Sequence, residues 1–261
     1  MDYNYLFGGV KISSLSGTDV NKRIAQNLLQ QKSFYCCVAN LRTTVAAQSD
    51  VAYKGVVNNA FLNIPDGMPL VWAGKLAGKS SIERITGAKL MQMMLSDTTS
   101  GYRHFFFGDT SETLNALVDA VRTRFKNSVI AGSYSPPFKK FDDADYADFV
   151  EKIQESGANV VWVSLGAPRQ DFFSEKMVSL TGATAFIGVG AAFRSIIGQY
   201  PDPPVFFQKI GLTGLFWRFK DHPLQSTIWY FKHFFLLVYY MIKILVRRYI
   251  FIKRSNGGSN V

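Results

Sequence analysis

The chain has 261 residues, of which 48% are hydrophobic. This is enough for one large domain with a sizeable core, and it excludes a disordered or fibrous protein. The net charge of +10 is uneven, because residues 218–261 carry +7 and the first 217 residues carry only +3. A basic C-terminal segment predicts an anionic partner, and a membrane and a nucleic acid are the usual candidates.

Four short apolar stretches, rich in β-branched and aromatic residues, predict buried strands. They are residues 34–39, 104–108, 159–165 and 184–189. Two segments of helical spacing lie among them, residues 110–125 with Thr110 as the expected N-cap and residues 142–159 with Gly157 as the expected stop. Alternating strands and helices predict an α/β fold in which helices cover both faces of a parallel sheet.

The two cysteines, Cys36 and Cys37, are adjacent within the first predicted strand. Neighbouring cysteines rarely bridge each other, so we expect two buried free thiols and a reducing compartment. The first residues show no basic region followed by an apolar core, so no signal peptide is expected.

Three predicted strands end in glycine, at Gly108, at Gly166, and at the pair Gly188 and Gly190. Ligands of a parallel sheet bind beyond the carboxyl ends of its strands, where glycine lets the backbone approach a ligand closely. One such glycine alone is more typical of a tight turn, but three in one sheet favour a nucleotide-type site. Phe193 stands where a dinucleotide-binding motif has its third glycine, which disfavours an NAD-type site.

The segment 226–254 is crowded with aromatic and aliphatic residues, and Lys243 interrupts its apolar run well short of the ~20 residues that a spanning helix needs. On a helix, Lys232, Lys243, Arg247 and Arg254 fall within roughly 60° of one another. This pattern is typical of a helix lying in a membrane interface. A helix packed on the core, a dimer contact and a short tilted span remain alternatives, whereas the high apolar share disfavours nucleic acid.

Seven segments, in the order in which they occur, together resemble the WecG/TagA/CpsF family of glycosyltransferases. They are VANLRTT (38–44), PDGMPLVWAGK (65–75), ERITGAKLM (83–91), FFFGDTSET (105–113), SLGAPRQDFF (164–173), GVGAAFRSIIG (188–198) and FFQKIGLTGLFWRFKDHP (206–223). The resemblance implies an inverting enzyme that transfers a sugar from a UDP-sugar to a polyprenyl-diphosphate-linked saccharide, without a metal or other cofactor. The product would serve surface or exopolysaccharide biosynthesis.

The resemblance also implies a domain organisation and a location. Residues 1–200 would form a Rossmann-like α/β core, residues 201–254 a basic C-terminal appendage with an interfacial helix, and residues 255–261 a disordered tail. The protein would lie peripherally on the cytoplasmic face of the plasma membrane and could form a homo-oligomer.

In this family the aspartate of the Pro-Asp-Gly segment is the proposed general base, and Asp66 matches it. A direct displacement needs a base to remove the proton of the acceptor hydroxyl, and burial would raise the pKa of this carboxylate and make it a better base. Outside such a context the segment would be a plain turn. Asn40, at the end of a predicted strand, would orient a sugar hydroxyl, and Arg218 of the appendage would stabilise the leaving diphosphate.

Further substrate contacts are implied at two segments. Thr86 and Gly87 match a Thr-Gly pair that opens a helix, where backbone N–H groups could meet a hydroxyl or a phosphate. Gly166, Pro168 and Gln170 match a G-x-P-x-Q segment that would shape the wall of the donor site.

The basic residues Lys232, Lys243, Arg247 and Arg248 would meet lipid headgroups or the diphosphate. Arg194 stands where the family often has aspartate, and Val38 where it usually has threonine. These departures leave a second interpretation open, a membrane-peripheral protein that binds a nucleotide sugar without catalysis. A soluble oxidoreductase of the same fold class is a third.

Overall fold

The computed structural model describes residues 3–200 and 223–257, with side chains of the second segment described at residue 228 and at residues 233–250. At its centre lies a parallel sheet of six strands in the order β4-β3-β8-β7-β5-β6. Its strands are β3 (Phe34–Ala39), β4 (Leu62–Pro65), β5 (Arg103–Gly108), β6 (Val129–Tyr134), β7 (Val160–Ser164) and β8 (Ala185–Gly188). The α/β fold expected from the sequence is confirmed.

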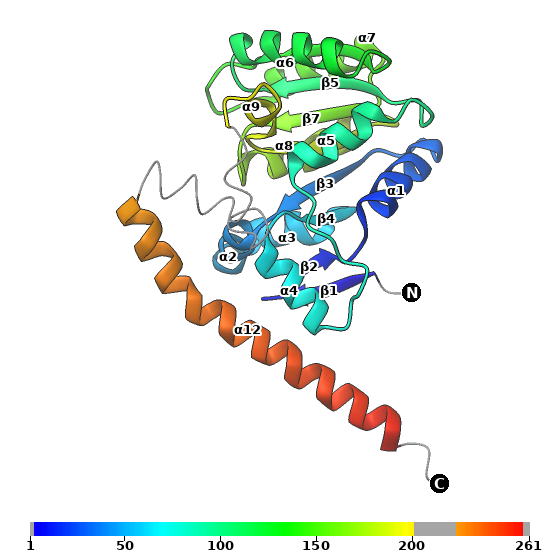
Figure 1. Ribbon diagram of the computed structural model, residues 1–261. Helices are drawn as coiled ribbons and strands as arrows, with labels where there is room; N and C mark the ends of the chain where they lie inside the picture. The colour runs from blue at the N-terminus through cyan, green and yellow to red at the C-terminus, as the bar shows by residue number, and fades with distance from the viewer. Residues whose placement is uncertain (1–2, 201–222, 258–261) are drawn as a thin grey trace.

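Helices cover both faces of the sheet, and a separate antiparallel hairpin of β1 (Asn4–Phe7) and β2 (Val10–Ser13) packs beside β4 (Figure 1). The helices on one face are α3 (Val51–Asn59), α4 (Met68–Leu76), α7 (Asp143–Ser156) and α8 (Arg169–Leu180), with α2 (Leu41–Ser49) at its end. The helices on the other face are α1 (Gly17–Leu29), α5 (Gly87–Ser96), α6 (Ser111–Arg124) and α9 (Ala192–Ile196).

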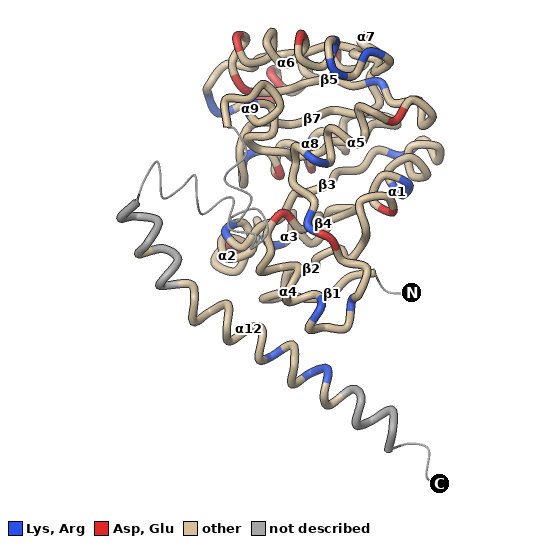
Figure 2. The backbone as a smooth tube through the Cα atoms, viewed as in Figure 1, with Lys and Arg blue, Asp and Glu red and all other residues tan. Residues whose placement is uncertain are grey.

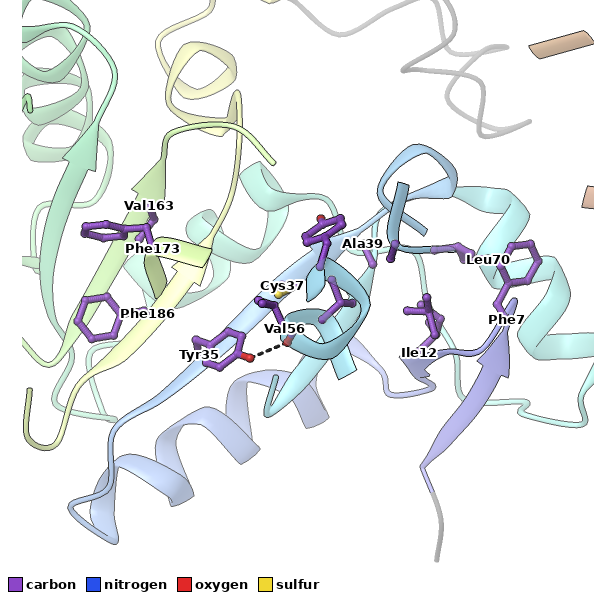
Figure 3. Close-up of a cluster of buried hydrophobic side chains, with 14 of the residues drawn as sticks. Phe7, Ile12, Tyr35, Cys37, Ala39, Val56, Leu70, Val163, Phe173 and Phe186 are labelled. Atoms are coloured by element: carbon purple, nitrogen blue, oxygen red, sulfur yellow. Dashed lines mark hydrogen bonds between the residues drawn. The ribbon is translucent and has the colours of Figure 1, made fainter. Parts of the chain in front are cut away.

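The sheet divides the core into two hydrophobic clusters, because successive side chains of a strand point to opposite faces. Cys37 and Phe107 belong to the cluster that Figure 3 shows, together with Phe173 of α8. Cys36 and Trp162 belong to the cluster on the opposite face. Both cysteines are free and buried, as expected.

The expected helix ends are also confirmed. The Thr110 side chain accepts a hydrogen bond from the backbone N–H of Thr113 at 3.2 Å and so caps α6. Asp142 caps α7 in the same way, and Gly157 ends α7 with a left-handed backbone at φ 64°. A left-handed position costs glycine little, because glycine has no Cβ.

The long C-terminal helix α12 (Pro223–Gly257) docks onto the hairpin and onto α2 and α4 through one narrow face. The Tyr240 ring lies 5.3 Å from the Phe7 ring, and its hydroxyl donates to Gln48 Oε1 at 2.9 Å. Ile244 is buried one helical turn further on, and Arg248 donates to the backbone oxygen of Leu76 at 3.1 Å. The helix ends at Gly257, whereas the expected tail starts at residue 255.

Away from these contacts, most of the described side chains of α12 are exposed, and many of the exposed ones are large and apolar. Its exposed large apolar side chains are Ile228, Phe234, Phe235, Val238, Tyr239, Ile242, Leu245, Val246, Tyr249 and Ile250. Lys243 and Arg247 are exposed among them. Figure 2 shows blue basic positions and no red acidic position on the described part of α12. None of the helices in the described part of the chain has the length and apolar content needed to cross a membrane.

Candidate functional site

Asp66 and Asn40 lie side by side, each directly after the end of its strand. β3 and β4 are paired with Ala39 opposite Pro65, and the Asp66 N–H donates to the Ala39 oxygen at 2.8 Å. The backbone of Gly67 also approaches Asn40, since a Cβ at Gly67 would lie 3.9 Å from the Asn40 Cβ. The structure therefore brings together the expected general base and the asparagine expected to orient a sugar hydroxyl.

The Asp66 carboxyl is half-buried, and its electrostatic surroundings favour the protonated form. Burial raises its pKa to about 7, although the nearby positive charge of Arg84 opposes this shift. A pKa near neutrality suits a general base, because the group is then both deprotonated in part and able to hold a proton. No described residue donates a hydrogen bond to the carboxylate.

Arg84 is a residue that the sequence prediction missed. Its Nε donates to the backbone oxygen of Asp66 at 3.1 Å, so the guanidinium is held against the Pro-Asp-Gly turn. The sequence feature that could have pointed to Arg84 is its position in the ERITGAKLM segment, three residues before the start of a helix. Arg84 supplies a cation beside the candidate base.

Asn40 lies in the candidate site and also caps a helix. Its side-chain oxygen accepts hydrogen bonds from the N–H groups of Arg42 at 3.0 Å and Thr43 at 3.1 Å, which caps α2. Among the described residues, none accepts from the Asn40 amide nitrogen. Capping fixes the side chain, so this N–H₂ group is oriented as a donor for a ligand.

Thr86 and Gly87 begin α5 at the same edge of the sheet. The Ile85 N–H donates to the Pro65 oxygen at 2.9 Å, which ties the start of α5 to the end of β4. The Thr86 hydroxyl caps the helix by accepting from the Lys89 N–H at 3.1 Å. Gly87 packs against the loop after β8, where an added Cβ would lie 2.8 Å from the Val189 oxygen.

Alanine at Gly87 and alanine at Gly55 are expected to change the stability of the fold in opposite directions. Gly87→Ala is expected to destabilise the fold by about 1–3 kcal/mol, because the clashing atom belongs to the backbone and cannot rotate away. Gly55→Ala is the matched control, since Gly55 lies within α3 and an added Cβ would meet open space. The control is expected to raise stability slightly. Thermal unfolding measures both, and equal effects would contradict the packing role of Gly87.

The glycines at the strand ends fall into two groups. An added Cβ would lie 2.5 Å from the Ser164 oxygen at Gly108, and 2.9 Å from Gln170 Nε2 at Gly188. These two glycines are therefore needed for close packing. At Gly166 and Gly190 an added Cβ would meet no described residue within 4 Å, so within the described part of the chain their backbone borders space that a ligand could enter.

Gln170 lies beneath the carboxyl edge of the sheet and is not exposed at its surface. Its side chain is buried, and its Oε1 accepts from the Gly190 N–H at 3.0 Å. The neighbouring Asp171 is buried too and accepts from the Tyr53 hydroxyl at 2.7 Å. Burial raises the pKa of Asp171 to about 6, while hydrogen bonds from Tyr53 and Cys37 oppose the shift. Gln170 thus shapes the loop after β8 from within, while Pro168 is exposed at its surface.

Asp109 and Arg194 form an ion pair further along the edge. Arg194 Nε and Nη2 donate to the two Asp109 carboxylate oxygens at 3.0 and 2.9 Å. Burial alone would raise the pKa of Asp109, but the hydrogen bonds from Arg194 and from the Thr110 N–H outweigh it and hold the pKa below its usual value. The sequence analysis noted Arg194 only as a departure and did not single out Asp109.

The basic residues of α12 lie apart from Asp66. Arg248 caps the C-terminal end of α4, and the nine residues of α4 separate this end from Asp66 by roughly 13 Å. Lys243 and Arg247 are exposed on α12, the Lys232 side chain is outside the described residues, and so is Arg218. A groove between α7 and α8, lined by Asp143, Tyr146 and Lys176 among others, contains none of the expected site residues.

The chain is similar to a known protein family and to a named relative. The sequence model of the Glycosyl transferase WecG/TagA/CpsF family matches residues 5–250. A protein of Bacillus spizizenii (strain ATCC 23059 / NRRL B-14472 / W23), named N-acetylglucosaminyldiphosphoundecaprenol N-acetyl-beta-D-mannosaminyltransferase, is 29% identical over 197 residues. The aligned region covers 75% of this chain and 74% of that relative.

Proposed function

Because the chain belongs to the WecG/TagA/CpsF family of glycosyltransferases, we propose that it transfers a sugar from a UDP-sugar to a saccharide linked to polyprenyl diphosphate. The name of the Bacillus relative supports an acceptor that begins with N-acetylglucosamine on the lipid diphosphate. The product would be an intermediate of a cell-surface or secreted polysaccharide.

The observation that carries this proposal is the half-buried Asp66, whose pKa is raised to about 7, beside Asn40. In a single displacement the acceptor oxygen attacks the anomeric carbon while Asp66 accepts the hydroxyl proton. The new C–O bond forms as the bond from the anomeric carbon to the diphosphate oxygen breaks, and UDP leaves. Attack opposite the leaving group inverts the anomeric carbon.

Cationic side chains would stabilise the charge that develops on the leaving diphosphate. Arg84 is held against the Asp66 turn. Arg218, which lies outside the described residues, is the second cation that we propose for this role. We propose that this arrangement needs no metal ion.

The exposed apolar face of α12, with Lys243 and Arg247 on it, supports peripheral attachment to the cytoplasmic face of the plasma membrane. Each cation near an anionic surface adds about 1 kcal/mol to binding. Attachment would confine the enzyme to the surface that holds its acceptor, and so raise the effective acceptor concentration.

The test is UDP release by the purified protein in detergent. A panel of UDP-sugars, including UDP-N-acetylmannosamine, UDP-N-acetylglucosamine and UDP-glucose, is offered with and without polyprenyl-diphosphate-linked N-acetylglucosamine. One donor is expected to give acceptor-dependent UDP release that persists in EDTA. Binding of UDP-sugars without release from any of them would favour a nucleotide-sugar-binding protein that lacks catalysis.

A further inference from the structure

The Asp109–Arg194 pair lies further along the carboxyl edge from Asp66, beyond β3. Asp109 follows β5, and Arg194 comes from α9, which follows β8. β7 lies between these two strands, so the salt bridge crosses the end of β7. With neighbouring strands ~4.8 Å apart, the pair lies roughly 15–20 Å along the edge from the end of β4.

The two partners of this salt bridge are exposed to different degrees. The Asp109 side chain is 6% exposed, and that of Arg194 is 40% exposed. The two carboxylate oxygens are occupied by Arg194, and one also accepts from the Thr110 N–H at 2.9 Å. The Tyr200 side chain also contacts the guanidinium. The exposed partner is therefore the Arg194 guanidinium, which carries the positive charge and the hydrogen-bond donors.

Pairing gives the guanidinium two properties. Two hydrogen bonds to one carboxylate fix its plane, because arginine donors form a rigid fork. The buried carboxylate also offsets its positive charge, which makes the pair a poor site for a phosphate. A fixed, planar donor group of low net charge suits a neutral, planar ligand that carries acceptor oxygens.

The distance along the edge identifies that ligand. In an extended nucleotide sugar, two phosphates and a ribose separate the anomeric carbon from the nucleobase. With the anomeric carbon at Asp66, the open backbone at Gly190 and Gly166 would border the middle of the molecule, and the base would reach the Asp109–Arg194 pair. We propose that Arg194, held by Asp109, binds the uracil base of the donor by donating to the carbonyl oxygen at C4. This inference rests on the proposed function.

A guanidinium at this position discriminates between bases. At C4 of the ring, uracil has a carbonyl oxygen that accepts a hydrogen bond, whereas cytosine has an amino group that donates one, and arginine has donors only. A cytosine base would therefore place donors against donors, so the site selects against it as well as for uracil. The pair sets the nucleotide specificity of the enzyme, while Asp66 acts on the acceptor.

The test measures dissociation constants of UDP, CDP and pyrophosphate by calorimetry for the full chain. Wild-type protein is expected to prefer UDP to CDP. Arg194→Gln is expected to reduce this preference about tenfold, the size of a hydrogen bond to a charged group, and to leave pyrophosphate binding unchanged. Arg194→Lys keeps a cation for Asp109 but lacks the planar fork, so it is expected to show the same loss in a folded protein. Arg122→Gln, an exposed arginine of α6, is the matched control.

Each outcome bears on the inference. A parallel loss of UDP, CDP and pyrophosphate in Arg194→Gln would assign Arg194 to the phosphates and overturn the nucleobase role. An unchanged preference for UDP in both Arg194 variants would make the salt bridge purely structural. If the wild-type protein binds no uracil nucleotide, the proposed donor class fails, and this inference fails with it.

Discussion

Asp66→Asn is expected to lower kcat by about a hundredfold or more, which is the usual contribution of a general base. The amide has nearly the same shape as the carboxyl, but it cannot accept the proton of the acceptor hydroxyl. Donor binding should change little, since the carboxyl acts on the other substrate. Acceptor-dependent UDP release measures the effect. Asp119→Asn, at an exposed position of α6, is the control, and equal rates for wild type and Asp66→Asn would return Asp66 to the role of a turn residue.

The raised pKa of Asp66 also fixes the pH dependence of the wild-type enzyme. Since the base must be ionised, kcat/KM is expected to rise with pH and to level off above about 7. Stability should change in the opposite direction. The folded state holds this proton up to about pH 7, whereas an unfolded chain releases it near pH 4, so stability falls as pH rises through this interval. Asp66→Asn is therefore expected to have a higher Tm than the wild type at pH 8 and a similar Tm at pH 4.

Replacing Phe235, Ile242 and Tyr249 together by serine is expected to weaken binding to anionic vesicles by at least a hundredfold. The three residues are spaced seven apart on one side of α12, and all are exposed. Burying one large apolar side chain contributes about 1.5–3 kcal/mol, and a tenfold change in affinity corresponds to about 1.4 kcal/mol. Vesicle sedimentation measures binding, and transfer to a lipid-linked acceptor in vesicles should fall in parallel.

The matched control replaces three large apolar residues exposed elsewhere, Leu29, Val51 and Phe138, by serine. This variant should bind vesicles as the wild type does. If the α12 variant also binds normally, the exposed face of the helix has another partner. Sedimentation velocity of wild type and variant would then show whether that partner is a second copy of the chain.

Much of the fold could be predicted because its central strands are buried on both faces. Such strands are continuous apolar runs, as in residues 34–39 and 160–164. β4 and β6 lack that signal. Asn63 interrupts β4, and its burial is tolerated because its amide nitrogen donates to the Val57 oxygen at 2.7 Å. β6 is an edge strand that is half-exposed and contains Gly132.

Part of the candidate site could be predicted from the order of strands and the residues that follow them. Asp66 and Asn40 each follow a strand of one parallel sheet, so strand pairing alone brings them together. Arg84 and Asp109 act through partners far away in the sequence, and only the folded chain shows those partners. The inward direction of Gln170 is likewise a tertiary property, since it depends on where the loop after β8 passes.

The adjacent cysteines of β3 have a practical consequence. Cys36 and Cys37 are one residue apart, yet each lies in a different cluster of the core, on opposite faces of the sheet. Burial raises the pKa of both thiols, that of Cys36 to about 12, so neither reacts while its layer stays closed. With one cysteine replaced, the labelling rate of the other reports the transient opening of a single layer. The two neighbouring cysteines thus report separately on the two layers of the core, one on each face of the sheet.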